Sequence, residues 1–231
     1  VYVESGADLE ALVDFAIDRG LGGIECLKRI PGWVGGAIYG NAGAYGQQIN
    51  ERILAVRVFD GQGFRHLSNE ECGFEYRTSG FKQHKEWIIC SATLRLEPGD
   101  KSALAAKAEE IREIRDEKFP PAMRCAGSIF KNLFFDRLPA GVRERVPSGM
   151  VKGGKVPSAW FLEQVGAKGM RRGEIQIAKY HANLLYADGE GAKAADVVAL
   201  IDELVGKVEA EFGIRLEPEV QFVGFPDRVS Y

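Results

Sequence analysis

The sequence predicts an α+β fold in two consecutive units. Short segments rich in β-branched and aromatic residues are interspersed with helical apolar patterns. With 45% hydrophobic residues, the 231-residue chain can bury a sizeable core. Two consecutive prolines, Pro120 and Pro121, end a long helical pattern near the middle of the chain. We therefore expect one unit at residues 1–118 and a second at 119–231.

The first unit is expected to begin with a helix and a glycine-rich region. Ser5 is placed to cap the helix, and Gly20 to end it. One side of this helix carries apolar residues at helical spacing, namely Leu9, Leu12, Val13, Ala16 and Ile17. A glycine-rich region follows at 30–46.

Two strands and a long helix complete the first unit. Residues 53–59 and 87–96 have strand composition, and the DGQG turn at 60–63 predicts a hairpin after the first. The alanine-rich, charged segment 102–118 is a strong helix former by propensity.

The second unit is expected to contain a Gly/Pro-rich loop at 138–157 and a short helix that Ser158 caps. A strand pair at 175–178 and 183–186 and a closing strand at 215–224 are also expected. Between them lies a long amphipathic helix with an apolar stripe of Val197, Val198, Ile201, Leu204, Val205, Val208 and Phe212.

Composition excludes several classes of function. The net charge is −3, with acidic and basic residues mixed along the chain, so no basic stripe predicts nucleic-acid binding. No apolar run approaches the roughly 20 residues that cross a bilayer. The four cysteines are too widely separated for a zinc site or a disulfide framework: Cys26, Cys72, Cys90 and Cys125. We expect a reduced, cytoplasmic protein that binds no metal, nucleic acid or membrane.

The glycine-rich region suits close approach of a ligand to the backbone. Glycines adopt positive φ at little cost, and exposed N–H groups can bind phosphate or ring oxygens. The spacing matches neither the dinucleotide-binding G-x-G-x-x-G turn nor a phosphate-binding P-loop. A purely structural set of turns explains the glycines equally well.

Two further segments carry ionisable candidates. EYRTSGFK (75–82) places an arginine among an aromatic ring and hydroxyls, which suits a carboxylate or phosphate ligand. LEPEV (216–220) has carboxylates two residues apart, which on a strand would share a face, although Pro218 bars a central position. The histidines, His66, His84 and His181, are scattered and read as structural or surface residues.

Five motifs in order resemble one enzyme family. They are IPGWVGGAIYGNAGAYG, CGFEYRTSGFK, AGSIFKN, PSAWFLEQVGAKGMRRGEIQIAKYHANLLY and FGIRLEPEVQFVG. Their order and approximate separations resemble the UDP-N-acetylenolpyruvoylglucosamine reductases, the MurB family, over nearly the whole chain. The short loop after the arginine motif resembles the subclass without the larger substrate-lid insertion.

The resemblance implies a monomeric flavoenzyme of peptidoglycan precursor synthesis. Residues 1–118 would be the second part of an FAD-binding α/β domain, and 119–231 a substrate-binding α/β domain. NADPH would reduce FAD, which would then reduce UDP-N-acetylglucosamine enolpyruvate to UDP-N-acetylmuramate. Hydride would reach the vinyl methylene carbon, charge would move onto the carboxylate as an enolate, and a proton would reach the adjacent carbon.

The resemblance also implies roles for individual residues. Ser128 matches the proton donor, Arg77 the arginine that binds the substrate carboxylate, and Glu219 the glutamate that completes the site. A serine hydroxyl is a weak acid, so its neighbours must stabilise the departing charge, and Lys131 is close in sequence. Residues matched to the substrate are Tyr76, Lys131, Asn132 and Lys155; those matched to FAD are Gly35, Gly36, Asn41, Gly43 and Gly46.

The sequence departs from the family pattern in places. Family members carry a further N-terminal segment whose loop receives the FAD pyrophosphate; nothing before Val1 supplies it, so weaker FAD binding is expected. Arg124-Cys125 stands where Pro-Asn is common, Leu133 where proline is common, and Trp33 where a small residue is usual.

Two other functions remain open. One is a non-catalytic module, diverged or truncated, that binds UDP-sugars without FAD. The other is an FAD-dependent hydroxy-acid oxidase, which the paired motifs AGSIFKN and EPEV disfavour.

Overall fold

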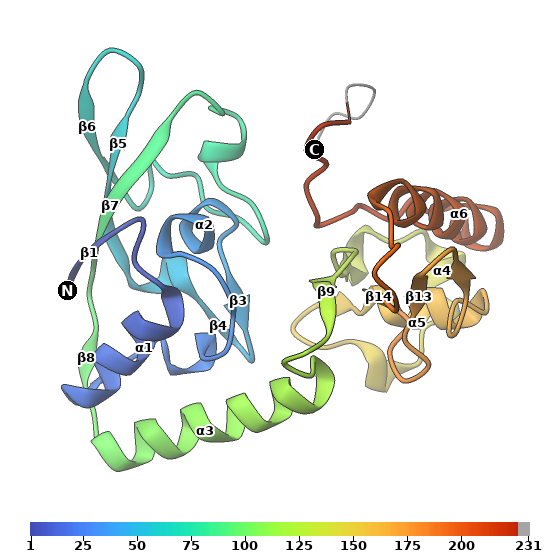
Figure 1. Ribbon diagram of the computed structural model, residues 1–231, viewed down its shortest axis with the longest axis horizontal. Coiled ribbons are helices and arrows are strands. Elements are labelled where there is room, and N and C mark those ends of the chain that lie inside the picture. Colours follow the sequence, from blue (N-terminus) through green and yellow to red (C-terminus); the bar gives the residue numbers. More distant parts are fainter. Residues whose placement is uncertain (226–231) are drawn as a thin grey trace. The chain divides into compact units, whose positions relative to one another are not determined.

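A computed structural model describes residues 1–225 and shows a mixed helix and sheet fold. The chain divides into two compact units, one of residues 1–120 and one that starts at Pro121 (Figure 1). In the part of the chain described, no helix has both the length and the apolar character needed to cross a membrane.

The first unit is built on an antiparallel sheet in the strand order β1-β7-β5-β6. Its strands are β1 (Tyr2–Glu4), β5 (Ile53–Phe59), β6 (Phe64–Ser68) and β7 (Ile88–Leu94). The helices are α1 (Leu9–Asp18), α2 (Val34–Tyr39) and α3 (Lys101–Lys118), of which α2 contacts β1 and β7. Two short pairs complete the unit: β2 (Leu21–Gly22) with β8 (Glu97–Pro98), and β3 (Gly43–Ala44) with β4 (Gln47–Gln48).

Most expectations for this unit are confirmed. The strand at 53–59, its hairpin to the next strand and the long helix all form, and the strand expected at 87–96 spans Ile88–Leu94. Gly20 ends α1 with a φ of 64°. The expected cap was wrong, because Asp8, not Ser5, has the extended backbone directly before the helix and accepts from Ala11 N at 2.9 Å.

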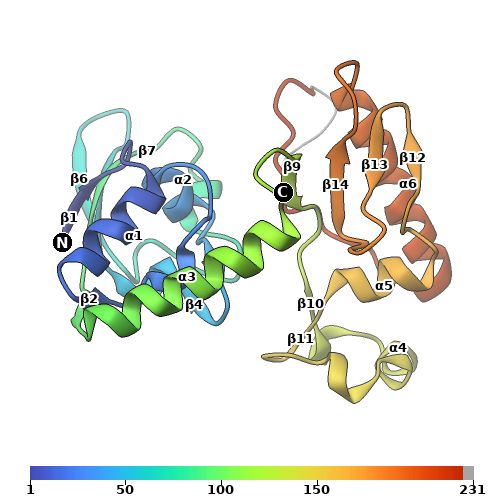
Figure 2. The ribbon, with the colours of Figure 1, turned by 60° about the horizontal axis from the view of Figure 1, so that its bottom comes forward.

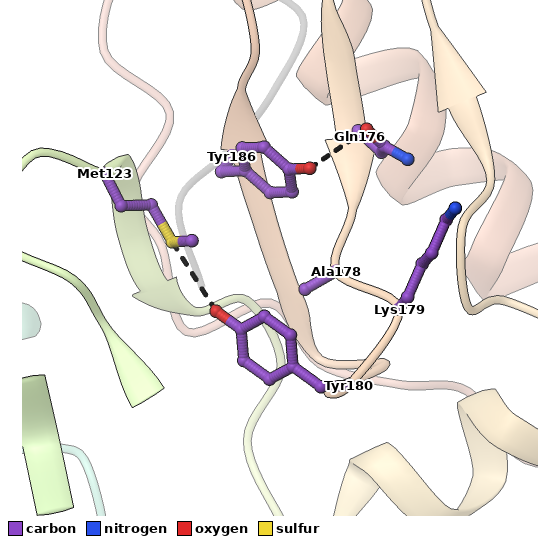
Figure 3. A pocket seen from close by; sticks show the side chains of 6 residues that line it. All are labelled: Met123, Gln176, Ala178, Lys179, Tyr180 and Tyr186. Atoms are coloured by element: carbon purple, nitrogen blue, oxygen red, sulfur yellow. Dashed lines mark hydrogen bonds between the residues drawn. The ribbon is translucent and has the colours of Figure 1, made fainter. Parts of the chain in front are cut away.

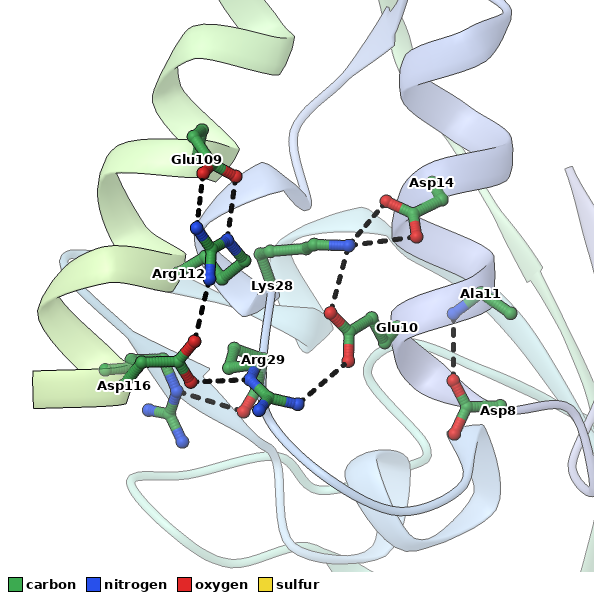
Figure 4. A network of polar contacts seen from close by, with 10 residues as sticks. Asp8, Glu10, Ala11, Asp14, Lys28, Arg29, Glu109, Arg112 and Asp116 are labelled. Atoms are coloured by element: carbon green, nitrogen blue, oxygen red, sulfur yellow. Dashed lines mark hydrogen bonds and ion pairs between the residues drawn. The ribbon is translucent and has the colours of Figure 1, made fainter. Parts of the chain in front are cut away.

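A polar network attaches the segment before the glycine-rich region to two helices (Figure 4). Lys28 Nζ lies 2.7 Å from Asp14 and 3.0 Å from Glu10, both on α1. Arg29 Nε donates to Asp116 of α3 at 2.7 Å. Burial alone would lower the pKa of Lys28, but the two carboxylates raise it above its ordinary value. Lys28 therefore stays charged and holds this segment in place.

The second unit packs helices against an antiparallel sheet in the order β12-β13-β14-β9 (Figure 2). These strands are β9 (Arg124–Ser128), β12 (Arg171–Arg172), β13 (Ile175–Ile177) and β14 (Leu184–Ala187). A short pair joins β10 (Leu133–Phe134) to β11 (Lys155–Val156). The helices are α4 (Ala140–Arg145), α5 (Ser158–Gln164) and α6 (Ala194–Phe212).

The core of this unit lies between the sheet and its helices. Ile175 and Ile177 of β13 and Leu185 of β14 are buried in one cluster with the apolar stripe of α6. The expected stripe is confirmed from Ile201 onward, since Ile201, Leu204, Val205, Val208 and Phe212 are buried. Val197 and Val198 are half-buried, and Leu200, which was not expected, is buried as well. Gly213 ends the helix in the left-handed conformation.

Three local expectations for the second unit were wrong. The region 138–157 is not a plain loop, because it contains α4 and β11. Ser158 does not cap α5: Pro157 is the cap residue, and the Ser158 hydroxyl instead lies 2.6 Å from Lys131 O. The strand at 215–224 does not form; one isolated bridge joins Pro218 to Phe130. Proline has no N–H to extend a ladder.

Candidate functional site

In the first unit, the glycine-rich region is bonded directly to the turn that carries Arg77. The Asn41 side-chain amide donates to Glu75 O at 2.8 Å, and Arg77 Nη2 donates to Gly43 O at 2.6 Å. Arg77 also lies near the ring of Tyr76, with 5.4 Å from its guanidinium carbon to the ring centroid. The structure therefore brings together four of the residues expected at the site in this unit.

The five residues matched to FAD divide into two groups. Gly35 and Gly43 are needed for packing, because an added Cβ would lie 2.9 Å from Ser5 Cβ and 2.8 Å from Gln47 O, respectively. Asn41 is 1% exposed, and its amide bonds within the protein. Gly36 and Gly46 are exposed, and an added Cβ at either would meet no protein atom within 4 Å. Only these two offer open backbone to a ligand.

Arg77 has a strained backbone. Glu75 and Thr78 exchange backbone hydrogen bonds of 3.1 and 3.2 Å around it, and its φ is 56°. The third position of such a turn usually carries glycine, since a Cβ costs energy at positive φ. Strain of this kind is typical of functional positions, because the surrounding structure must maintain it. This observation favours a functional role for the Arg77 side chain.

In the second unit, a β-bulge directs Ser128. Ser128 pairs with Leu184, and Cys125 pairs with Tyr186. Between these two pairs, β9 contains one residue more than β14. Gly127 has a φ of 76°, as the extra residue of such a bulge often does. An added Cβ at Gly127 would meet no protein atom within 4 Å. Glycine is therefore required here by backbone conformation and not by lack of space.

The bulge places Ser128 on the open face of the sheet. Cross-strand partners share a face, and neighbours along a strand alternate. Through its pairing, Ser128 lies on the same side as Tyr186 and Gln176, opposite the face whose isoleucines pack with α6. In an unbroken strand Ser128 would take the other face.

That open face also carries a pocket of about 380 Å³ (Figure 3). Its lining residues are Met123, Gln176, Ala178, Lys179, Tyr180 and Tyr186. Tyr186 Oη donates to Gln176 Oε1 at 2.9 Å. Partial burial, together with nearby Cys125 and Tyr186, raises the pKa of Tyr180, so its hydroxyl stays protonated and donates to Met123 Sδ at 3.9 Å.

The remaining candidates of this unit gather around residues 128–132. Lys131 Nζ forms an ion pair with Glu217, and Lys131 N donates to Glu217 O at 3.0 Å. Glu219 N donates to Ile129 O at 2.7 Å. The LEPEV segment is thus attached to the residues that directly follow Ser128.

Asn132 and Lys155 lie at the ends of the short pair of strands. Asn132 Oδ1 accepts from Ser158 N at 3.2 Å. Lys155 pairs with Phe134 in the ladder, and its ammonium lies 5.1 Å from the centroid of that ring. Both expected substrate residues therefore belong to the same unit as Ser128.

Sequence reasoning missed two polar residues that hold this segment. Asn183 is 3% exposed, Ser158 is fully buried, and the side chains of both bond to backbone atoms of residues 130–131. A polar residue within an apolar run, as in HANLLY, was the available signal, because buried polar groups need partners.

The unusual residues occupy ordinary backbone positions. Trp33 is 67% exposed and bridges Asp8 through its backbone. Arg124 and Cys125 are ladder residues of β9, and Leu133 pairs with Val156. None of these four residues interrupts the elements that carry the candidate residues.

Two family models match the chain. One, described as the C-terminal domain of UDP-N-acetylenolpyruvoylglucosamine reductase, matches residues 119–223. The other, described as an FAD binding domain, matches residues 1–67.

Individual relatives match almost the whole chain. It is similar to the UDP-N-acetylenolpyruvoylglucosamine reductase of Solibacter usitatus, with 56% identity over 97% of this chain and 72% of the relative. The reductase of Carboxydothermus hydrogenoformans is 37% identical over 97% of this chain and 67% of the relative. The crystal structure of the reductase (MurB) from Thermus caldophilus matches with a TM-score of 0.73 and 30% identity, over 96% and 71% of the two chains.

Proposed function

The chain belongs to the UDP-N-acetylenolpyruvoylglucosamine reductase family, and we propose that it reduces UDP-N-acetylglucosamine enolpyruvate to UDP-N-acetylmuramate with FAD and NADPH. The observation that carries the proposal is the bulge at Gly127, which turns Ser128 out of the core and onto the face with the pocket. A serine kept there at the cost of a regular ladder suits a proton donor.

The glycine-rich region fits a flavin in part. Gly36 and Gly46 leave open space where a side chain would otherwise stand, so a bulky ligand can approach their backbone closely. Gly35, Asn41 and Gly43 would shape this surface from below through internal contacts. FAD, when bound, supplies the hydride carrier between NADPH and the enolpyruvyl ether.

Arg77 would bind the substrate carboxylate. Its guanidinium is held by Gly43 O and lies near the Tyr76 ring, so its orientation is set before substrate arrives. Negative charge moves onto the carboxylate during reduction. A fixed cation beside the carboxylate therefore stabilises the transition state more than it stabilises the bound substrate. Tyr76 would contact the substrate beside it.

Ser128 would donate the proton to the carbon next to the carboxylate. The substrate would then lie on the sheet face that carries Ser128 and the pocket. Glu219 would complete the acid site, since its backbone is bonded next to Ser128. Lys131, Asn132 and Lys155 would hold the sugar nucleotide, whose diphosphate needs cationic and amide donors.

An anaerobic absorbance experiment tests this function. The protein supplied with FAD should lose its flavin absorbance with NADPH and regain it when the enolpyruvyl sugar is added, and mass spectrometry should find a product heavier by two hydrogens. Protein that binds the UDP-sugar but no FAD would instead be a binding module. Flavin that is reduced by a hydroxy acid would identify an oxidase.

A further inference from the structure

Asn183 forms hydrogen bonds to the backbone of the segment after Ser128, much as a neighbouring β-strand would. Its side-chain Oδ1 accepts from Phe130 N at 2.9 Å, and its Nδ2 donates to Phe130 O at 2.9 Å. Its own carbonyl oxygen accepts from Ile129 N at 3.1 Å. The amide of one side chain therefore satisfies both backbone groups of Phe130, which is 1% exposed.

The opposite edge of the same segment is bonded to the LEPEV segment. Ile129 O accepts from Glu219 N at 2.7 Å, and Lys131 N donates to Glu217 O at 3.0 Å. The peptide group between residues 129 and 130 thus bonds to Glu219 through its oxygen and to Asn183 through its N–H. One peptide plane links the two residues.

We propose that Asn183 is a positioning residue that fixes Ser128 relative to Glu219 through the backbone of Ile129 and Phe130; this rests on the proposed function. An asparagine suits the task because its amide offers one donor and one acceptor in a plane. Without it, the buried N–H of Phe130 loses its partner and the Phe130 carbonyl keeps only the Ser158 hydroxyl at 3.2 Å, so the segment must shift to satisfy the N–H. A displacement of about 1 Å at reacting groups slows chemistry by up to about 10²-fold.

The test separates the two half-reactions. In the FAD-loaded enzyme, Asn183→Ala should slow reoxidation by the enolpyruvyl sugar by about tenfold or more, while flavin reduction by NADPH changes by less than about twofold. Val208→Ala, which cuts into the same core at a fully buried position of α6, is the control for lost stability. It should lower the melting temperature and leave both half-reactions unchanged.

A double-mutant cycle with Ser128→Ala asks whether Asn183 acts through Ser128. In the Ser128→Ala background, Asn183→Ala should cost less than about twofold further, since the group it positions is gone. The inference about Asn183 would be overturned, and the proposed function left standing, if Asn183→Ala slowed reoxidation by the same factor with and without Ser128. The same would hold if Asn183→Ala slowed flavin reduction as much as reoxidation. If Ser128→Ala leaves reoxidation unchanged, the proposed proton donor is wrong and the inference falls with it.

Asn183→Asp provides a second variant and a rescue. A protonated carboxyl has the donor and acceptor of the amide, whereas an ionised one only accepts. The rate of reoxidation relative to the parent should therefore rise as the pH falls. The titratable groups near this segment are His181, Lys131, Glu217 and Glu219. Because the parent also contains them, the ratio of the variant's reoxidation rate to the parent's removes their effect. A flat ratio would contradict the inference.

Hydrogen exchange gives a readout independent of turnover. In Asn183→Ala, the amides of residues 129–131 should exchange faster than in the parent, with β13 unchanged. Unchanged protection at Phe130 would show that the amide of Asn183 does not hold this segment. Should Asn183→Ala fail to fold, Ser158→Ala removes the hydroxyl that lies 2.6 Å from Lys131 O and is subject to the same half-reaction and cycle measurements.

Discussion

Lys131 forms an ion pair with the carboxylate of Glu217, whereas Glu219 is attached to the neighbouring Ile129 by its backbone N–H. The two glutamates of LEPEV therefore have different surroundings, although both lie beside the segment that follows Ser128. The Glu217 side chain is 49% exposed. We expect Glu219 to act in the reaction and Glu217 to act on Lys131.

Two isosteric changes distinguish these glutamates. Glu219→Gln should lower the rate of substrate reduction by about tenfold or more with little change in KM, since its interaction develops mainly in the transition state. Glu217→Gln removes the charge beside Lys131 and should change KM by less than about threefold, because solvent reaches the half-exposed Glu217 carboxylate and screens the pair. Steady-state kinetics of both variants decide the matter, and the reverse pattern would exchange their roles.

Ser128→Ala should affect only one half-reaction. Reduction of the flavin by NADPH needs no proton donor at the substrate carbon and should stay nearly unchanged. Reoxidation by the enolpyruvyl sugar should slow by roughly 10²-fold, as expected for a lost general acid. Stopped-flow absorbance measures both steps, and unchanged reoxidation would remove Ser128 from the mechanism.

Arg77→Gly should separate stability from activity. Glycine relieves about 1 kcal/mol or more of strain at a φ of 56°, but loss of the bond to Gly43 O costs about 1 kcal/mol. The melting temperature should therefore change little, while substrate reduction falls by about 10²-fold. Arg77→Lys keeps the charge and the strain, and it should retain more activity. A large loss of stability in Arg77→Gly would indicate a structural role instead.

Gly127→Ala should destabilise the second unit by about 1 kcal/mol, because alanine is disfavoured at a φ of 76°. The space around Gly127 is open, so no clash adds to this cost. Thermal unfolding measures the effect. Gly141→Ala is the matched control: it has equal space but lies in α4 without positive φ, and it should be neutral or stabilising.

Glu25→Gln should make the first unit less sensitive to acid. Burial would raise the pKa of Glu25, but hydrogen bonds from Gly23 N, its own N–H and Gln47, with the charge of Arg52, lower it overall. A carboxyl with a lowered folded pKa stabilises above its unfolded pKa, about 4.3, and the contribution is lost as the pH falls through the folded value. At neutral pH, the free energy of unfolding of the parent should exceed that of Glu25→Gln by about 1 kcal/mol, and the difference should vanish in acid. Thermal unfolding across this pH range would contradict the account if the difference stayed constant.

Elements with a strong local pattern could be predicted from the sequence. The strand at 53–59 and the helix ending at Lys118 follow from propensity and turn residues alone. The cap at Asp8 was missed because an acceptable serine stood three residues earlier. The roles of Ser158 and Asn183 could not be predicted, since their partners at 130–131 lie about 27 or more residues away and depend on tertiary packing.

The bulge in β9 responds differently to deletion and to substitution in evolution. Loss of one residue from 125–127 would let β9 pair with β14 without interruption and would leave Ser128 opposite Leu184, on the same face as before. A substitution that removed the bulge at constant length would instead place Gly127 opposite Leu184 and turn Ser128 toward the helices. A lineage that needs the serine can therefore shorten this strand, but it cannot make the strand regular at its present length.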